Sequence, residues 1–192
     1  MKKLLVGICT KNKNRHRNLK KTLNSIINLK RDKFFIKIIL IENGPKKTLK
    51  LFFRKIKKRK NIKIYYYNEK KIGIPYARNK VLKILKLIKG DYIAFVDDDC
   101  ILDKNWLFNM YNFIKRNDVD IVTGPQISLS KKNYIRSLDR IERHKTYLDW
   151  AATNNVFCKK KILASSNIKF NESMANTGGS DQLFFRILKK RG

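Results

Sequence analysis

Three consecutive aspartates, Asp97, Asp98 and Asp99, follow a short apolar run at residues 92–96. Neighbouring carboxylates that are drawn toward a protein interior repel one another and lose hydration, which is costly unless a cation neutralises them. A divalent metal ion is the simplest such cation, because hard ions prefer carboxylate oxygens. Successive side chains of an extended segment point to opposite sides, so Asp97 and Asp99 are expected to face one cleft. The cluster therefore predicts a metal site, and the alternative is a solvated acidic turn after an edge strand.

Further polar residues follow other apolar runs. Thr10 follows the run at residues 3–9, and Glu42 follows the run at 36–41. A carboxylate suits paired N–H or O–H donors, and an arginine fork suits phosphate or carboxylate. Arg78 offers such a fork, either to a phosphate-bearing ligand or to one of the aspartates. Glu42 precedes the tripeptide Asn-Gly-Pro, which forms turns unaided, so a ligand-binding role and a simple turn are both open there.

The elements that must position these residues alternate between strand and helix. Apolar runs rich in Ile, Val and Tyr predict strands at residues 3–9, 36–41, 62–67, 92–96 and 119–122. Apolar positions at helical spacing predict helices between them, over residues 19–27, 49–56, 75–88 and 104–115. Strands joined by single helices run mostly parallel, in a sheet that helices cover on both faces. Because the carboxyl ends of such strands share one edge, the polar loops are expected to converge there.

The alternation weakens after residue 125. No structure is assigned to residues 128–150, which mix aromatic and charged side chains without clear spacing. A strand is predicted at 154–157 and a helix at 181–190. The length of 192 residues suits a single domain.

The chain carries 46 Lys and Arg against 15 Asp and Glu, which gives a formal net charge of +31. The basic residues are spread over every segment, which indicates a compositional bias more than a dedicated binding patch. Such a charge still predicts attraction to polyanions, namely nucleic acid, an anionic membrane face or a phosphate-bearing substrate. Nucleic acid is the disfavoured partner, because a nucleic-acid module gathers basic and aromatic side chains on one face. Here carboxylates occupy the edge of the sheet where the polar loops are expected to converge.

Cysteine usage and hydropathy bear on the cellular compartment. Cys9, Cys100 and Cys158 form no C-x-x-C pair, and the amino-terminal apolar run is too brief for a signal peptide. A reducing compartment is expected, and hence a cytoplasmic protein. No uncharged stretch reaches the ~18 residues that cross a bilayer, so any membrane contact is expected to be peripheral, on anionic lipid at the inner face of the cell membrane.

The order of these segments resembles that of family 2 inverting glycosyltransferases with the GT-A fold. The segments that carry the resemblance are VGICTKN at residues 6–12, ILIENG at 39–44, GIPYARN at 73–79, FVDDD at 95–99 and GGSD at 178–181. Together they extend over nearly the whole chain. The resemblance implies an α/β, Rossmann-like, mostly parallel sheet with helices on both faces and a smaller acceptor-side region. It also implies one domain, 1–192, with a nucleotide-sugar-binding half at 1–125 and an acceptor and catalytic-base half at 126–192.

By this resemblance the aspartate cluster corresponds to the DxD motif of the family. Asp99 is then the best metal ligand, Asp97 is directed to the metal or to a ribose, and Mn²⁺ or Mg²⁺ is the implied cofactor. The residues expected to bind the nucleotide-sugar donor are Thr10, Glu42, Arg78, Asp97 and Asp98. Many relatives carry Asp where this chain has Glu42, which shifts the reach of that carboxylate by one methylene.

Asp181 is the general base that the resemblance implies, since the family places a Glu-Asp pair at the start of a late helix. Its carboxylate would take the proton of the attacking hydroxyl, in a single displacement that inverts the anomeric centre. Here Ser180 replaces the glutamate, and Asn154 and Asn155 match a stretch near the acceptor. The plain alternative is that Ser180 or Asp181 only caps a helix.

The implied reaction is metal-dependent transfer of a sugar to a hydroxyl of a glycan or lipid-linked acceptor, in the synthesis of cell-surface polysaccharide or lipopolysaccharide. Two other classes stay open, an inactive short paralogue and a basic protein that binds nucleic acid or anionic surfaces. The inactive paralogue is considered because family members usually continue beyond the position of Gly192, where they can supply a further ligand for the metal or the diphosphate. A nucleotidyltransferase is disfavoured, because residues 10–14 lack the glycines of a phosphate loop. The sequence names neither the sugar nor the nucleobase nor the acceptor.

Overall fold

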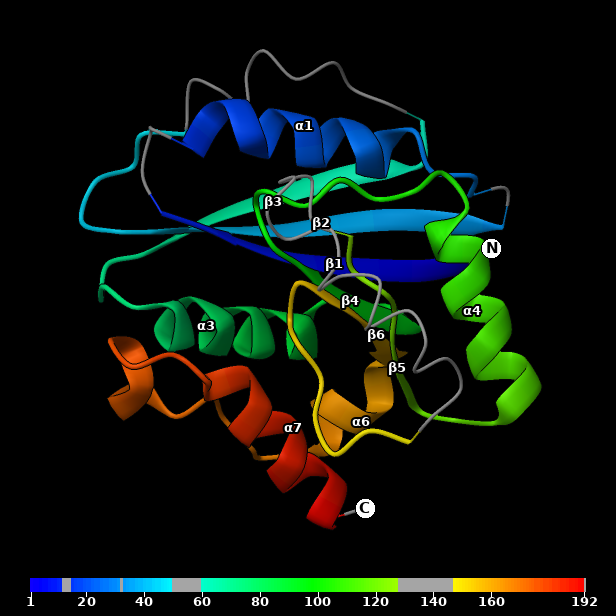
Figure 1. Cartoon of the computed structure of the whole chain (residues 1–192). Coiled ribbons are helices and arrows are strands. Elements are labelled where there is room, and N and C mark those ends of the chain that lie inside the picture. The colour runs from blue at the N-terminus through cyan, green and yellow to red at the C-terminus, as the bar shows by residue number, and fades with distance from the viewer. Residues whose placement is uncertain (12–14, 32, 50–59, 128–146, 192) are drawn as a thin grey trace.

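The computed structural model describes residues 1–11, 15–31, 33–49, 60–127 and 147–191. In these residues six strands form one sheet, in the order β3-β2-β1-β4-β6-β5 (Figure 1). The strands are β1 (Lys2–Thr10), β2 (Phe34–Asn43), β3 (Ile62–Glu69), β4 (Tyr92–Val96), β5 (Ile121–Thr123) and β6 (Asn155–Lys159). The helices are α1 (His16–Ile27), α3 (Ile74–Leu87), α4 (Trp106–Asn117), α6 (Lys160–Ser165) and α7 (Ser180–Arg191), with a short 3-10 helix, η3 (Glu172–Ala175).

The sheet is mostly parallel. β1 pairs in parallel with β2 and β4, and β2 pairs in parallel with β3. β6 runs antiparallel to both of its neighbours, β4 and β5. β5 therefore points in the same direction as β4, as expected for two strands joined by one helix, but β6 lies between them. The predicted α/β class is confirmed, and a strand from the second half of the chain completes the sheet.

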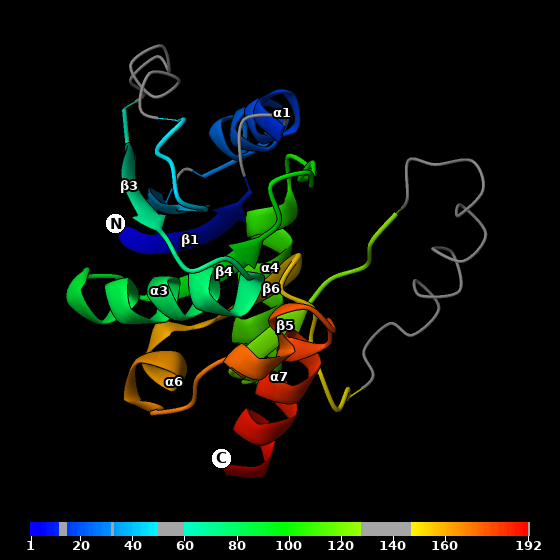
Figure 2. The same ribbon diagram turned by 90° about the vertical axis from the view of Figure 1, so that its left-hand side faces the viewer.

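Helices cover both faces of this sheet (Figures 1 and 2). The apolar sides of α1 and α4 pack in one core, which includes Leu23 and Leu107. Those of α3, α6 and α7 pack in a second core, which includes Val81, Leu163 and Phe184. Every residue of β4 is buried, because a central strand of a doubly covered sheet has apolar neighbours on both sides. The residues that follow β4 are thus held at the edge of a rigid layer.

The predicted elements agree with the observed ones within a few residues, and β4 agrees at both ends. The predicted helix at 49–56 lies almost wholly outside the described residues, as does most of the unassigned stretch at 128–150. α6 and η3 are not predicted, because six and four residues are too few to show a helical period. No helix in the described ranges has the length and apolarity that spanning a membrane requires. The division into halves at residue 125 stays a prediction.

Candidate active site

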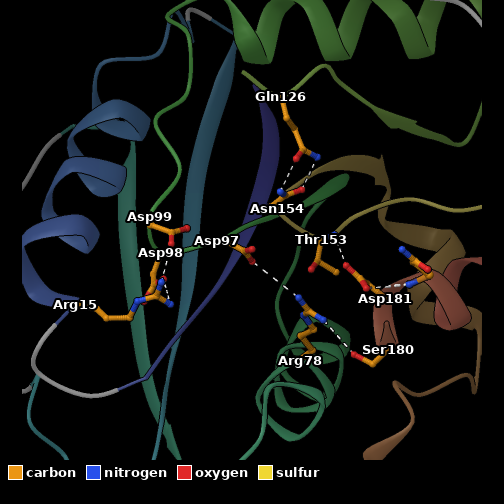
Figure 3. Close-up of polar contacts among 11 residues, drawn as sticks. Arg15, Arg78, Asp97, Asp98, Asp99, Gln126, Thr153, Asn154, Ser180 and Asp181 are labelled. Atoms are coloured by element: carbon orange, nitrogen blue, oxygen red, sulfur yellow. Dashed lines mark hydrogen bonds and ion pairs between the residues drawn. The ribbon is translucent and has the colours of Figure 1, made fainter. Parts of the chain in front are cut away.

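The parallel strands end at one edge of the sheet, where the polar loops converge as expected. The strand register places Thr10 beside Glu42 and Glu42 beside Asn68. Asp97 follows the last residue of β4, and the start of α7 carries Asp181 to the same edge (Figure 3). Residues from the two ends of the chain therefore meet in one site.

Asp98 is the buried member of the aspartate cluster, with only 1% of its surface exposed. One carboxylate oxygen accepts a 2.5 Å hydrogen bond from the Thr10 hydroxyl, and the other lies 2.9 Å from the Arg15 guanidinium. Burial raises the pKa of Asp98, while the Thr10 hydrogen bond and the Arg15 charge oppose that rise. Asp98 and Thr10 thus join the end of β4 to the end of β1. Contact of either residue with a nucleotide sugar stays a prediction.

Arg15 is a site residue that the sequence analysis does not predict. It lies between β1 and α1, and its fork reaches Asp99 at 2.7 Å as well as Asp98. No local pattern distinguishes it, because it is one of 46 basic residues and lies 84 positions from Asp99 in the sequence. The aspartate cluster therefore already contains a cation supplied by the chain itself.

Arg78 connects Asp97 to the start of α7. It is buried on α3, its Nη2 lies 4.0 Å from Asp97, and its Nη1 donates a 3.2 Å hydrogen bond to the Ser180 hydroxyl. Its guanidinium also lies over the Phe170 ring, 5.6 Å from the centroid. Arg78 thus pairs with an aspartate, which is one of the two roles left open for it, and contact with a diphosphate stays a prediction.

The Asp97 carboxyl lies in an acidic neighbourhood. Burial raises its pKa to about 6, and the Arg78 charge opposes that rise. The charges of Asp99, Asp98 and Asp181 raise the pKa of Asp97 further. Asp181 is therefore close enough to Asp97 to act on it electrostatically.

Asp181 is placed by a backbone that only glycine adopts readily. Gly178 and Gly179 precede α7 with φ angles of 78° and 75°, in the left-handed region. Asp181 then falls in the first turn of the helix, where backbone N–H groups favour a negative charge. Its two oxygens accept hydrogen bonds from the backbone N–H of Thr153, at 3.3 Å, and of Gln182, at 3.0 Å. These backbone groups fix the position of the carboxylate. No side chain among the described residues donates a hydrogen bond to it or forms an ion pair with it.

Glu42 is engaged with its own loop. Its carboxylate is 1% exposed and accepts hydrogen bonds from the backbone N–H groups of Thr48 and Leu49 and from the hydroxyls of Thr48 and Tyr66. Burial by itself would raise the pKa of Glu42, but the hydrogen bonds from Thr48 and Tyr66 outweigh it and the pKa is lowered. Glu42 is thus more than a turn residue, because it anchors residues 48–49 to β2. A contact with the nucleotide stays a prediction.

Glu42→Gln is expected to lower the free energy of unfolding by about 2 kcal/mol near pH 7, because charge-assisted hydrogen bonds are lost. The folded pKa lies below the unfolded value of 4.5, so ionised Glu42 stabilises the fold above that pH. This contribution is lost as the pH falls through the lower folded value. Urea unfolding near pH 7 and at about pH 3 should therefore show the two proteins converging in acid. The exposed Glu172→Gln is the control, and an unchanged gap in acid would contradict this account.

The two asparagines expected near an acceptor differ in their surroundings. Asn154 and Gln126 exchange two amide hydrogen bonds of 2.7 Å each. Asn155 is buried, accepts a 2.7 Å hydrogen bond from the Trp106 indole and donates one of 2.9 Å to the Pro125 carbonyl. Asn155 therefore joins β6 to Trp106 and to the backbone of Pro125 beside the site. Acceptor binding by either asparagine stays a prediction.

Two carboxylates are available to a divalent metal. The side chains of Asp97 and Asp99 are 42% and 43% exposed, whereas Asp98 is turned inward. In the part of the chain that the structure describes, no three His, Cys, Asp or Glu side chains converge on one point. This donor set fits an ion that the protein holds with one or two carboxylates while a phosphate-bearing ligand and water supply the rest, as Mg²⁺ often is.

Comparison with known proteins agrees with the resemblance to family 2 glycosyltransferases. The family described as "Glycosyl transferase family 2" matches residues 5–180. The chain is 23% identical over 188 residues to the succinoglycan biosynthesis protein ExoM of Rhizobium meliloti, a match that covers 94% of this chain and 59% of ExoM. It is 28% identical over 117 residues to the poly(ribitol-phosphate) beta-glucosyltransferase of Bacillus spizizenii, covering 60% of this chain and 18% of that protein.

Solved structures confirm the expected GT-A fold. The structure of S. aureus TarS 1–349 superposes with a TM-score of 0.67 at 19% identity and covers 96% of this chain and 54% of its own. The mannosyltransferase PcManGT from Pyrobaculum calidifontis, in complex with GDP-Man and Mn²⁺, gives a TM-score of 0.66 at 15% identity over 93% of this chain and 49% of its own. The chain spans less than two thirds of the length of each of these relatives.

Proposed function

The chain belongs to glycosyl transferase family 2, and from this premise we propose that it transfers a sugar from a nucleotide-diphosphate donor to a hydroxyl of an acceptor, with inversion. The observation that carries the proposal is the arrangement of acids at one edge of the sheet. Asp97 and Asp99 are half-exposed after β4, and Asp181, on α7, is close enough to Asp97 to act on it electrostatically. The proposed metal-dependent transfer uses both functions, carboxylates for a cation beside the leaving diphosphate and a separate carboxylate for a proton.

Asp97 and Asp99 are the residues that would hold Mn²⁺ or Mg²⁺. When bound, the ion would offset the negative charge that grows on the diphosphate as the bond to the sugar breaks. Arg78 holds the Asp97 side chain in place and, through Ser180, ties it to the start of α7. The contacts of Arg78, on α3, therefore connect the Asp97 carboxylate to the helix that carries Asp181.

Asp181 would accept the proton of the attacking hydroxyl. The hydroxyl oxygen then bonds to the anomeric carbon on the face opposite the departing diphosphate, which inverts that centre without a covalent enzyme intermediate. The hydrogen bonds from the backbone N–H groups of Thr153 and Gln182 orient the carboxylate for this task. Capping of α7 and catalysis are compatible roles for the same side chain.

The acceptor is proposed to be a glycan or a lipid-linked sugar in the assembly of a polysaccharide. The names of the relatives support this class, since ExoM is a succinoglycan biosynthesis protein and the Bacillus protein is a poly(ribitol-phosphate) beta-glucosyltransferase. Nucleotide-sugar complexes of TarS with UDP-GlcNAc and of PcManGT with GDP-Man support the class of the donor.

A screen of UDP-, GDP- and dTDP-sugars tests the proposal. Binding is measured by thermal shift, and cleavage is measured by the release of nucleoside diphosphate. Both measurements are made with Mn²⁺, with Mg²⁺ and with a chelator. At least one donor should bind and be cleaved in a metal-dependent way. If no nucleotide sugar binds under any condition, the inactive short paralogue becomes the better interpretation.

Arg15→Gln is expected to tighten Mn²⁺ binding by about threefold to tenfold, because the guanidinium and the ion compete for the Asp99 carboxylate. Isothermal calorimetry without nucleotide measures this directly. Arg17→Gln, on the exposed face of α1, is the matched control and should bind Mn²⁺ as the wild type does. Equal or weaker binding by Arg15→Gln would show that Arg15 supports the metal site instead of competing with it.

A further inference from the structure

Thr153 has a buried hydroxyl without a hydrogen-bond partner among the described residues. The residue is 1% exposed, and its Oγ1 is buried. Buried hydroxyl groups are nearly always hydrogen-bonded, and an exception calls for an explanation. The backbone N–H of the same residue donates to the Asp181 carboxylate at 3.3 Å. The unpaired hydroxyl therefore lies next to the proposed general base (Figure 3).

The neighbours of Thr153 in the sequence differ from it, because their side-chain polar atoms already have hydrogen-bond partners. The Asn154 amide is paired with Gln126 through both its oxygen and its nitrogen. The Asn155 amide is likewise occupied, by the Trp106 indole and the Pro125 carbonyl. Of these three consecutive polar side chains, Thr153 is the one whose polar atom has no hydrogen-bond partner among the described residues.

We propose that the Thr153 hydroxyl binds the attacking oxygen of the acceptor and holds it for Asp181, an inference that rests on the proposed function. A hydroxyl both donates and accepts, so Thr153 can donate to one lone pair of that oxygen. The proton of the attacking hydroxyl goes to Asp181, the other lone pair forms the bond to the anomeric carbon, and the bond from that carbon to the diphosphate oxygen breaks. Thr153 thus sets the direction of attack without taking or giving a proton.

Thr153→Val tests this inference, because valine has nearly the same shape and lacks the hydroxyl. Water serves as the acceptor, and the substrates are UDP-GlcNAc, UDP-glucose and GDP-mannose with Mn²⁺. The expected kcat for metal-dependent hydrolysis is lower by about tenfold, with the dissociation constant of the sugar nucleotide unchanged. Thr153→Ser retains the hydroxyl and should keep most of the activity. The Tm of Thr153→Val should equal or exceed that of the wild type, since no internal hydrogen bond is lost.

Thr123→Val is the matched control, because the Thr123 hydroxyl donates a 2.8 Å hydrogen bond to the Asn155 carbonyl on the neighbouring strand. That variant should lose Tm and keep its kcat. Wild-type hydrolysis by Thr153→Val, or a loss of Tm like that of Thr123→Val, would overturn the role given to Thr153 and leave the proposed function intact. Absence of sugar-nucleotide binding by the wild type would overturn the proposed function, and this inference with it.

Discussion

Asp181→Asn is expected to leave nucleotide-sugar binding unchanged and to lower the rate of sugar transfer by about 10³-fold. Asparagine has the shape of aspartate but cannot take the proton of the attacking hydroxyl. The side chain lies on α7, across the site from the aspartates proposed to bind the metal, so the donor should lose no contact. The rate of nucleoside diphosphate release and the dissociation constant of the donor, measured side by side, separate the two effects.

Asp149→Asn is the matched control for this experiment. Asp149 is exposed and pairs at 2.7 Å with Lys189, on the same helix as Asp181. Its substitution changes the charge near α7 by the same amount without touching the site, so transfer should stay at the wild-type rate. Wild-type turnover by Asp181→Asn would mean that another residue is the base and that the carboxylate only stabilises the start of α7.

Asp99→Ala should abolish the dependence of donor binding on Mn²⁺. The substitution removes one of the two half-exposed carboxylates. Residues that only support a metal ligand contribute about 10-fold to 100-fold to metal affinity, and a ligand itself should contribute at least as much. A loss of at least about 100-fold in Mn²⁺ affinity is therefore expected. Calorimetric titration of Mn²⁺ with and without nucleoside diphosphate measures the effect. Asp99 is a cleaner test than Asp98, because Asp98 also joins β4 to β1 through Thr10 and its loss would disturb the fold.

Asp118→Asn provides the control for Asp99→Ala. The Asp118 side chain is 98% exposed, and the residue follows α4 just before β5, at the opposite edge of the sheet. Its charge is lost as in Asp99→Ala, so any general effect of net charge on binding of an anionic nucleotide would appear in both. Undiminished Mn²⁺ affinity in Asp99→Ala would place the metal elsewhere in the site.

The sequence by itself determined the elements that build this site. Each predicted strand of the parallel part is present, and the signal is clearest for β4, because a strand buried on both faces must be apolar along its whole length. The aspartates had to follow β4, since charged residues cannot continue such a strand. The glycines at 178–179 entered only as part of the family resemblance, and the structure shows that they adopt a left-handed backbone before α7. The residues proposed for the metal and the base were therefore visible before any coordinates.

Only the tertiary structure decided how these residues are paired. It inserted β6 between β4 and β5 and joined Arg15 to Asp99, 84 positions away. It also gave the Glu42 carboxylate hydrogen bonds from the backbone of residues 48 and 49. Within the described ranges it also left the Thr153 hydroxyl beside Asp181 without a hydrogen-bond partner. Periodicity and turn chemistry are local properties of a chain, whereas these pairings depend on which distant side chains come within about 3 Å of one another once the sheet is assembled. Local patterns thus placed the acids at the edge of the sheet, and packing determined the partner of each.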